Sequence, residues 1–402
     1  IAQKVGIAKD SPLRAQAGIS YALTEASAQG HCGLPYAELV PLAVKLLDIP
    51  ESIIETAIAQ EIADEVLFPD TVESQPCVFL APLYYAEQSI AAQIRRLKSG
   101  AATLPAFDAD KAIPWVEQKL SIQLADTQKE AIRLALSSKL LVITGGPGVG
   151  KTTLVNSILN IMTVKGVKPL LCAPTGRAAK RLYESTGLEA KTIHRLLEIN
   201  PINGQFKRNA DYPLECDLLV ADECSMIDVP LASQLLKAVA TSTAMVLVGD
   251  VDQLPSVGAG DVLRDLIASG VIPYCRLDTI FRQDTSGLIV RNAHHVNHGE
   301  PFETRTGDSD FYFVETGEPS KIIARTLELI TQRIPRKFGL DPLADVQILT
   351  PMRKNLLGTE NLNNVLQTAL NPHGPTLTRG GSSFRRGDRV MQLCNNYDKE
   401  VF

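Results

Sequence analysis

A glycine-rich segment at residues 145–152 carries the residue types that hold the phosphates of a nucleotide. Gly145 is followed after four residues by Gly150, Lys151 and Thr152, which is the spacing of the phosphate-binding loop. Glycines let consecutive backbone N–H groups point at phosphate oxygens, and the N-terminus of a helix adds partial positive charge. In this pattern the lysine reaches the β- and γ-phosphates, and the threonine hydroxyl binds Mg²⁺. The segment therefore predicts a nucleoside triphosphate site with Mg²⁺.

The flanks of this loop have the secondary structure that the pattern requires. Residues 140–143 are apolar and predict a buried strand, and residues 153–161 have the periodicity of a helix. We therefore expect most contacts to ATP from one continuous segment. The expected contacts are Gly146, Gly148, Val149, Gly150, Lys151, Thr152 and Thr153.

A glutamine lies just ahead of the loop. Asp126 is the expected N-cap of a helix, and Gln128 lies in the first turn of that helix. A carboxamide offers both a donor and an acceptor, which matches the edge of adenine. An ordinary surface glutamine is the alternative, but the position before a phosphate loop favours an adenine contact.

Two adjacent carboxylates end the apolar run at residues 216–221. Two acids beside an apolar strand would be costly if they had only a structural role. At a strand end near the loop, Asp222 can hold Mg²⁺ and Glu223 can orient the attacking water or accept its proton. Gln253 follows another apolar run at residues 244–249 and can sense the γ-phosphate. We therefore expect Lys151, Asp222, Glu223 and Gln253 to carry the chemistry.

The elements that must position these side chains alternate along the chain. Apolar runs near residues 140, 170, 217 and 244 are separated by helical patterns, which predicts an α/β fold with a parallel sheet and its site at the carboxyl ends of the strands. A helix after residue 175 carries Arg177, Lys180 and Arg181, which either face a phosphodiester backbone or form a solvated surface. His194 is either a contact to DNA or a capped, satisfied histidine.

The segments around this core have less specific patterns. Residues 20–29, 36–47, 52–65 and 84–98 predict helices, whose function is either DNA binding with wing-like connections or packing. Asn203–Gly204 favours a small β-hairpin within residues 198–211, with an ordinary connection as the alternative. Strands expected at residues 275–278, 311–315, 346–350 and 388–393 suggest a second, incomplete α/β unit.

Composition limits the alternatives. The 402 residues suggest two or three domains, and the first residue is Ile rather than Met, as expected of an excised piece of a longer protein. The net charge of −5 means that contact with nucleic acid requires a local basic patch. Seven cysteines without a C-x-x-C pair predict reduced thiols in the cytoplasm, and no apolar run is long enough to cross a membrane.

Several segments resemble, in order, the motifs of superfamily 1 helicases, and their residues are most similar to the RecD-like 5′-to-3′ DNA helicases. The GTPase Asn-Lys-x-Asp signature and the transporter Leu-Ser-Gly-Gly-Gln signature do not occur. The segments are residues 145–152, 173–177, 222–226, 248–255, 280–283, 351–353 and 361–364.

The resemblance implies two RecA-like domains with ATP between them and single-stranded DNA across their top. The expected domains are a helical one at residues 1–108, a first RecA-like domain at 109–270 with a small β-hairpin insertion at about 198–215, and an incomplete second one at 271–402. The resemblance also implies that Arg282 acts at the γ-phosphate. DNA contacts are expected from Pro174, Thr175, Arg177 and His194. The inserted SH3-like module and the later motifs are not expected within these residues.

These observations predict an ATP-dependent 5′-to-3′ helicase that acts on single-stranded DNA and single-strand/duplex junctions. The resemblance suggests a role in DNA repair or recombination, with nuclease or repair-complex subunits as possible partners and no membrane. This piece of chain is expected to be poorly active alone. The alternative is a DNA-binding subunit whose nucleotide site is regulatory rather than a motor.

Overall fold

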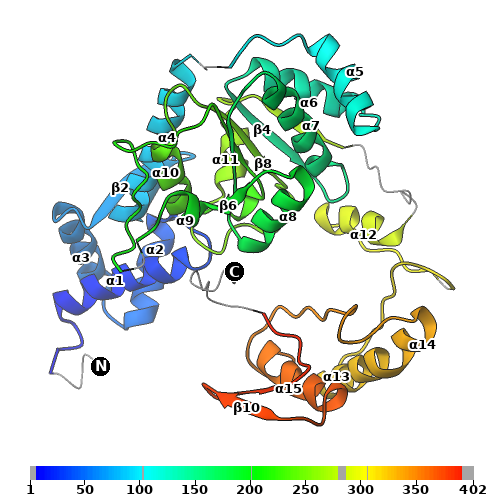
Figure 1. Cartoon of the computed structure of the whole chain (residues 1–402). Helices are drawn as coiled ribbons and strands as arrows, with labels where there is room; N and C mark the ends of the chain where they lie inside the picture. Colours follow the sequence, from blue (N-terminus) through cyan, green and yellow to red (C-terminus); the bar gives the residue numbers. More distant parts are fainter. Residues whose placement is uncertain (1–5, 102–103, 201, 279–286, 306, 392–402) are drawn as a thin grey trace. The chain divides into compact units, whose positions relative to one another are not determined.

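Figure 1 shows the fold of the computed structural model, which describes residues 6–101, 104–200, 202–278, 287–305 and 307–391. The chain divides into two units, residues 1–285 and residues 286–402. The larger unit contains the N-terminal helices and the phosphate-binding loop. The sequence had suggested a boundary near residue 270 instead.

The N-terminal part of the larger unit is a helix-turn-helix with a β-hairpin beside it. Strands β1, β3 and β2 form an antiparallel sheet in that order, so the β2–β3 hairpin is the wing of a winged helix. The four predicted helices are present, whereas the three strands were not predicted. The elements are α1 (Pro12–Ser27), β1 (Gly33–Pro35), α2 (Tyr36–Leu47), α3 (Glu51–Ala63), β2 (Leu67–Val72), β3 (Gln75–Leu80) and α4 (Ala81–Ser99).

The charge of this winged helix bears on its function. No Lys, Arg or His occurs between Lys45 and Arg95, and α3 exposes Glu51 and Glu55. A helix that docks on DNA needs cations to replace the counterions of the phosphates. Of the two functions left open by the sequence, the charge favours packing over DNA binding.

Helix α4 joins the winged helix to the central sheet. Ile90, Ile94 and Leu97 are buried in the same core as α10 (Val229–Ala238). The Arg96 guanidinium donates to the backbone oxygens of Leu236 at 3.1 Å and of Val239 at 2.6 Å. Because the last carbonyls of a helix have no partner within that helix, these bonds cap the C-terminal end of α10.

The central sheet has six strands in the order β6-β5-β7-β8-β4-β9, and all neighbouring strands are parallel. Its strands are β4 (Leu140–Gly145), β5 (Pro169–Ala173), β6 (Ala190–Thr192), β7 (Leu218–Ala221), β8 (Ala244–Gly249) and β9 (Tyr274–Leu277). The helices of this part are α5 (Ala109–Leu120), α6 (Asp126–Ser137), α7 (Lys151–Val164), α8 (Gly176–Thr186), α9 (Ile193–Leu196), α10 and α11 (Val262–Ala268).

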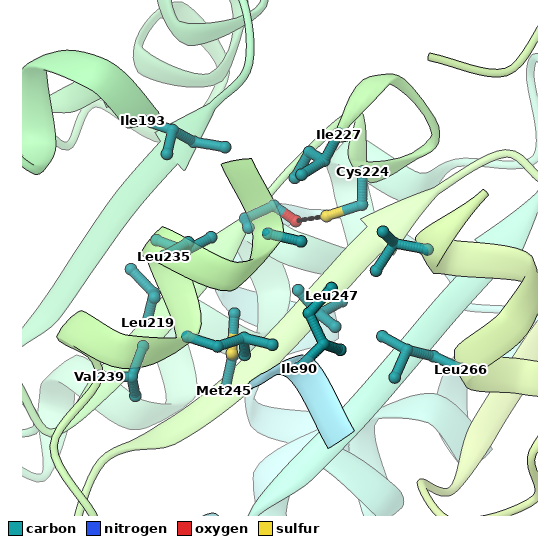
Figure 2. Packing of buried hydrophobic residues seen from close by; sticks show 14 of the residues in the cluster. Ile90, Ile193, Leu219, Cys224, Ile227, Leu235, Val239, Met245, Leu247 and Leu266 are labelled. Atoms are coloured by element: carbon teal, nitrogen blue, oxygen red, sulfur yellow. Dashed lines mark hydrogen bonds between the residues drawn. The ribbon is translucent and has the colours of Figure 1, made fainter. Parts of the chain in front are cut away.

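Each face of the sheet is covered by helices. Figure 2 shows part of one core, in which Leu219, Met245 and Leu247 of the strands lie with Leu235 of α10 and Leu266 of α11. The other core contains apolar residues from α5, α6, α7 and α8. Because side chains alternate along a strand, successive residues of one strand enter opposite cores.

The four strands predicted near residues 140, 170, 217 and 244 are confirmed as β4, β5, β7 and β8. The strand predicted at residues 275–278 also exists, as β9, but its place in a second α/β unit was wrong. It pairs with β4 at the edge of the first sheet, where Cys275 lies opposite Ile143. Local residue preferences predict a strand but do not identify its neighbour.

The smaller unit contains no parallel sheet within its described residues. The strands predicted at residues 311–315 and 346–350 are wrong, since those residues are irregular, and Leu349 is 88% exposed. Residues 388–391 are also irregular, and the rest of that predicted strand lies outside the described residues. The elements are α12 (Leu288–Asn297), α13 (Pro319–Glu328), a π-helical turn (Leu329–Arg333), α14 (Ile334–Phe338), α15 (Thr359–Leu370), β10 (Thr376–Arg379) and β11 (Ser382–Arg385).

Two further findings concern environment. None of the described helices combines the length and the apolar character that a bilayer span requires. All six cysteines in the described ranges are free thiols. Burial raises the pKa of the Cys172 and Cys224 thiols, which keeps them protonated in the core.

Candidate nucleotide site and nucleic-acid surface

The phosphate-binding loop connects β4 to α7 and depends on glycine at three positions. A side chain at Gly145 would put a Cβ 2.6 Å from the backbone oxygen of Leu277 on β9. Gly148 and Gly150 have φ angles of 81° and 82°, which only glycine adopts without strain. The loop therefore has the backbone freedom that a cradle of N–H groups needs.

Lys151 is the first residue of α7, and its side chain folds back over the loop. The ammonium donates to the backbone oxygen of Gly145, and to that of Gly146 at 2.9 Å. These bonds fix a positive charge beside the N-terminus of α7, where phosphates bind most favourably. Thr152 and Thr153 follow in the first turn of this helix, and both are exposed.

Asp222 and Glu223 come directly after β7. Oδ1 of Asp222 accepts the backbone N–H of Glu223 at 2.9 Å. Burial raises the pKa of the Asp222 carboxyl, and the charge of Glu223 raises it further, whereas the charges of Lys151 and Arg181 act in the opposite direction. The phosphate-loop lysine and this acid follow β4 and β7, which both pair in parallel with β8, so they lie at the same edge of the sheet.

Glu223 has an unusual backbone conformation. Its φ and ψ are 54° and 40°, in the left-handed region, and it precedes a 3₁₀ turn at Cys224–Met226. Such a conformation costs energy in a residue with a side chain, and it is concentrated at functional sites. The sequence carried no signal for it, because no glycine or asparagine stands there.

Asp250 is a site residue that the sequence analysis missed. It follows β8, is 1% exposed, and accepts Nε2 of Gln253 at 3.2 Å. The neighbouring N–H of Val251 donates to Oγ1 of Thr144 on β4 at 3.4 Å. Asp250 therefore orients Gln253, and the signal available was its place at the end of an apolar run.

The loop after Asp250 is fastened to the N-terminal winged helix. The N–H of Gly260 donates to the backbone oxygen of Gly30 at 2.9 Å. A side chain on Gly260 would meet Val229 at 2.3 Å and the sulfur of Cys32 at 3.1 Å. The Ser256 hydroxyl donates to the backbone oxygens of Gly258 and Gly260, and these bonds hold the two parts of the loop together.

The residues expected to hold Mg²⁺ have suitable chemistry. Thr152 offers an exposed hydroxyl, and Asp222 offers a carboxylate that has lost part of its water. Hard oxygen donors of this kind are the ligands that Mg²⁺ prefers. A divalent cation would also offset the cost of ionising a buried acid, so the donor set fits the ion.

Gln128, the expected adenine contact, lies at the start of α6 beside the phosphate loop. Its side chain is buried at 2% exposure, and both ends of its carboxamide bond to backbone groups of α6 and the phosphate loop. Asp126 is not the N-cap of α6; Ala125 takes that position and Asp126 is the first helical residue.

The residues expected to contact DNA lie at the start of α8. The Thr175 hydroxyl accepts the N–H of Ala178 at 3.2 Å and so caps the helix. Pro174 is half-buried and Arg177 is exposed. Arg181 lies one turn further along α8, and its positive charge acts to lower the pKa of the Asp222 carboxyl.

His194 and the predicted hairpin lie together. The His194 ring is 5.8 Å from that of Phe206, and His194 is exposed on α9. In place of the predicted pair of strands, this segment has one isolated antiparallel bridge, between Ile199 and Phe206. Gly204 has the left-handed φ of 70°, and Ile202 is 93% exposed at the tip. Arg282 lies outside the described residues.

Two families match parts of the chain. Residues 128–259 match the AAA domain family, and residues 362–402 match the SH3 domain of ATP-dependent RecD-like DNA helicases. The second match overturns the expectation that this SH3-like module lies outside the chain. Its described strands, β10 and β11, are short and exposed, so they gave little apolar periodicity to detect.

Two relatives extend these matches. The chain is 35% identical over 413 residues to the ATP-dependent RecD2 DNA helicase of Deinococcus radiodurans, covering 100% of this chain and 55% of that protein. It is 28% identical over 376 residues to the RecBCD enzyme subunit RecD of Haemophilus influenzae, covering 73% of this chain and 58% of that protein. The chain thus spans little more than half the length of these relatives.

A solved structure, that of the Pif1 helicase from Candida albicans, is 23% identical over 44% of each chain, with a TM-score of 0.35. That score is too low for the likeness to bear on function. The relatives, the two domain families and the ordered motifs agree with one another, and the chain belongs to the RecD-like family of superfamily 1 helicases.

Proposed function

We propose that the protein containing this chain is an ATP-dependent helicase that moves 5′ to 3′ along single-stranded DNA and separates duplex as it moves. The observation that carries the proposal is the placement of Lys151 and Asp222 at the same edge of the sheet: they follow β4 and β7, which both pair in parallel with β8. A fixed cation beside a carboxylate pair is the arrangement that phosphoryl transfer to water requires. The names of the relatives support the same activity.

Each side chain has a separate role in this proposal. Lys151 stabilises charge on the β- and γ-phosphates, while Glu223 orients the attacking water and accepts its proton. Gln253, held by Asp250, contacts the γ-phosphate or that water. Thr152 and Asp222 would hold Mg²⁺, which, when bound, neutralises phosphate charge.

Further nucleotide contacts in the proposal come from the loop backbone and from Arg282, for which the family resemblance implies a role at the γ-phosphate. An arginine that reaches the γ-phosphate only on domain closure would couple hydrolysis to movement. The loop contacts proposed are Gly146, Gly148, Val149, Gly150 and Thr153, with Gln128 at the adenine. The helical domain is still proposed at residues 1–108, but because β9 pairs with β4, the boundary expected at residue 270 between the two RecA-like domains moves to a position after β9.

Single-stranded DNA is the proposed track, and single-strand/duplex junctions are the proposed substrate. The single strand of DNA would be contacted by Pro174, Thr175, Arg177 and His194. The turn at residues 198–211 would contact the single-strand/duplex junction. Support comes from the exposure of Arg177 and His194. Action in the cytoplasm on DNA repair or recombination, alone or with nuclease subunits, is part of the proposal.

The alternative is a DNA-binding subunit whose nucleotide site only regulates. Such a site has no need of a general base. The left-handed backbone of Glu223 is costly to maintain without a function, which favours the motor.

The deciding experiment measures ATP hydrolysis by the full-length protein with and without single-stranded DNA, for wild type and Glu223→Gln. We expect DNA to stimulate wild type, and Glu223→Gln to bind ATP normally but hydrolyse it at least about 100-fold more slowly. Glu215→Gln is the matched control, because the Glu215 side chain is 92% exposed. If DNA does not stimulate hydrolysis by wild type, or if Glu223→Gln hydrolyses ATP at the wild-type rate, the result would favour a subunit whose nucleotide site is regulatory.

A further inference from the structure

The turn at residues 250–253, which carries Gln253, is held by its own backbone. The N–H of Val251 donates to Oγ1 of Thr144 on β4 at 3.4 Å. The N–H of Gln253 donates to the backbone oxygen of Asp250 at 3.2 Å, which closes the turn. The peptide that follows Val251 lies between these two bonds, and both of its polar groups are also bonded.

That peptide is held from two sides. The backbone oxygen of Val251 accepts Nη2 of Arg264 at 3.0 Å, and the N–H of Asp252 donates to Oδ1 of Asp250 at 3.1 Å. In a planar trans peptide the C=O and the N–H point in opposite directions, so the two bonds together fix the plane. Because the chain continues from this plane into Gln253, its orientation sets the position from which the Gln253 side chain extends.

Arg264 reaches the turn from the far end of the same loop. It lies on α11, and its Nε pairs with Oδ2 of Asp261 at 3.0 Å. Asp261 occupies the N-cap position of α11, yet its side chain makes no cap bond there. An aspartate at this position commonly caps the helix. Here its carboxylate bonds the guanidinium instead, so Arg264 joins Val251 at the start of the loop to Asp261 at its end.

The two partners of Arg264 require a guanidinium. Nε and Nη2 are donors on one rigid, planar group, and they reach a carboxylate and a carbonyl oxygen at the same time. The donors of a lysine all lie on one nitrogen at the end of a flexible stem, so they cannot hold both partners in a fixed geometry. The helix that carries the guanidinium is itself anchored, because Leu263 and Leu266 of α11 are buried in the core of the sheet.

We infer that Arg264 is a positioning residue for the hydrolysis step. It holds the peptide after Val251, and through that peptide it holds Gln253 in the position from which its amide meets the γ-phosphate or the attacking water. This inference rests on the proposed role of Gln253. Arg264 itself contacts neither nucleotide nor water in the proposal, so its loss should change hydrolysis and leave nucleotide affinity as it is. Its side chain is 63% exposed, so its bonds contribute little to the stability of the fold.

The test uses the full-length protein with Arg264→Ala and Arg264→Lys. Three quantities are measured: the calorimetric dissociation constant of ADP with Mg²⁺, the melting temperature, and single-turnover hydrolysis of ATP in the presence of single-stranded DNA. Arg325→Ala is the matched control. Arg325 lies on α13 and also pairs with an acid three residues away, Glu328, at 2.7 Å.

We expect Arg264→Ala to hydrolyse ATP about five- to tenfold more slowly than wild type, with the ADP constant within about twofold. Arg264→Lys should lose less, because an ammonium can retain one of the two partners. The melting temperatures of both variants should stay within about 2 °C of wild type. Arg325→Ala should match wild type in all three measurements. If Arg264→Ala hydrolyses ATP at the wild-type rate, or loses ADP affinity as much as hydrolysis, the inference is wrong.

A double-mutant cycle then asks whether Arg264 acts through Gln253. Gln253→Ala removes the amide that Arg264 is inferred to position, so adding Arg264→Ala should slow hydrolysis no further. Losses that multiply would show that Arg264 acts by another route and would overturn the inference. The proposed function fails separately, if wild type does not hydrolyse ATP at all. If melting curves show that Arg264→Ala is misfolded, the cycle is run with Arg264→Lys.

Discussion

The carboxylate of Asp250 accepts a hydrogen bond from Nε2 of Gln253 at 3.2 Å, from a side chain that is itself exposed. The second carboxylate oxygen accepts the N–H of Asp252 at 3.1 Å. Because Asp250 is 1% exposed, a buried acid fixes the direction of an amide that solvent would otherwise leave free. The proposed γ-phosphate sensor is thus preorganised by a neighbour three residues earlier.

Asp250→Asn tests this arrangement. The new amide nitrogen would face the N–H of Asp252 or Nε2 of Gln253, so one of these partly buried hydrogen bonds is lost, at a cost of about 1 kcal/mol. We expect ATP affinity to stay within about threefold while single-turnover hydrolysis falls at least about tenfold. Asp252→Asn is the control, because its carboxylate pairs outward with Arg276. Equal losses of affinity and hydrolysis would indicate a general fold defect instead.

Lys151→Ala should abolish turnover. The variant loses the ammonium that lies over the loop, which is the main side-chain charge partner of the transferred phosphoryl group. A fall of at least about 100-fold in DNA-stimulated hydrolysis is expected, measured on the full-length protein. Lys165→Ala, in the turn after α7, serves as a charge-matched control. Near-normal turnover in Lys151→Ala would remove the basis of the assignment.

Asp222→Asn should raise stability while removing Mg²⁺-dependent nucleotide binding. Burial raises the pKa of this carboxyl, so the folded state binds its proton more tightly than the unfolded state does. The stability that this group contributes is therefore present below its ordinary pKa and is lost as pH rises through the raised value. At pH 7 without nucleotide, the melting temperature of the variant should exceed that of wild type.

The pH profile provides the control for that prediction. The free energy of unfolding of wild type should fall as the pH rises above the ordinary pKa of an aspartate. The Asp222→Asn variant should not show this fall. Asp211→Asn, at an exposed position, should leave the profile as it is in wild type. A variant that melts lower than wild type at pH 7 would contradict the sign of this effect.

The turn at residues 198–211 gives a prediction about strand separation. Replacing residues 202–205 with two glycines removes the exposed Ile202 but leaves Phe206, which packs against the core. Unwinding of a forked duplex should fall at least about fivefold, while hydrolysis stimulated by single-stranded DNA stays within about twofold. Parallel loss of both activities, or of neither, would mean that the turn has no separate role at the junction.

Arg96→Ala tests the attachment of the winged helix. Removing two hydrogen bonds to the end of α10 should cost about 1–2 kcal/mol locally, since the site is only partly buried. Hydrogen exchange of the α4 amides should accelerate accordingly. Arg96→Lys should recover part of the loss, because an ammonium cannot span both carbonyls as the guanidinium fork does. Arg95→Ala, at an exposed neighbour, should have no effect.

The sequence predicted those parts of the fold that depend on local pattern. The strands before Gly145 and Asp222 and the helix after Lys151 follow from apolar periodicity and glycine spacing. Partners across the chain were not predictable in this way. β9 pairs with β4, which lies more than 100 residues earlier in the sequence. No pattern in residues 274–277 indicates which strand they pair with.

The candidate site shows the same division. Residue type predicted Lys151, Asp222 and Glu223 as site residues, because few other functions explain them at those positions. Gln128 was also predicted by type, but its bond to the backbone of the phosphate loop was not predicted. Side-chain direction and burial depend on packing, which a single sequence does not encode in any short pattern.

The hydrogen bond from Gly260 to Gly30 makes the winged helix part of a mechanical linkage. The loop at residues 250–260 carries Gln253 at one end, and at its other end it is pinned to the N-terminal unit. A displacement of the winged helix would therefore act on the same short loop that holds Gln253. The winged helix and the proposed γ-phosphate sensor are therefore connected through the backbone of residues 253–260.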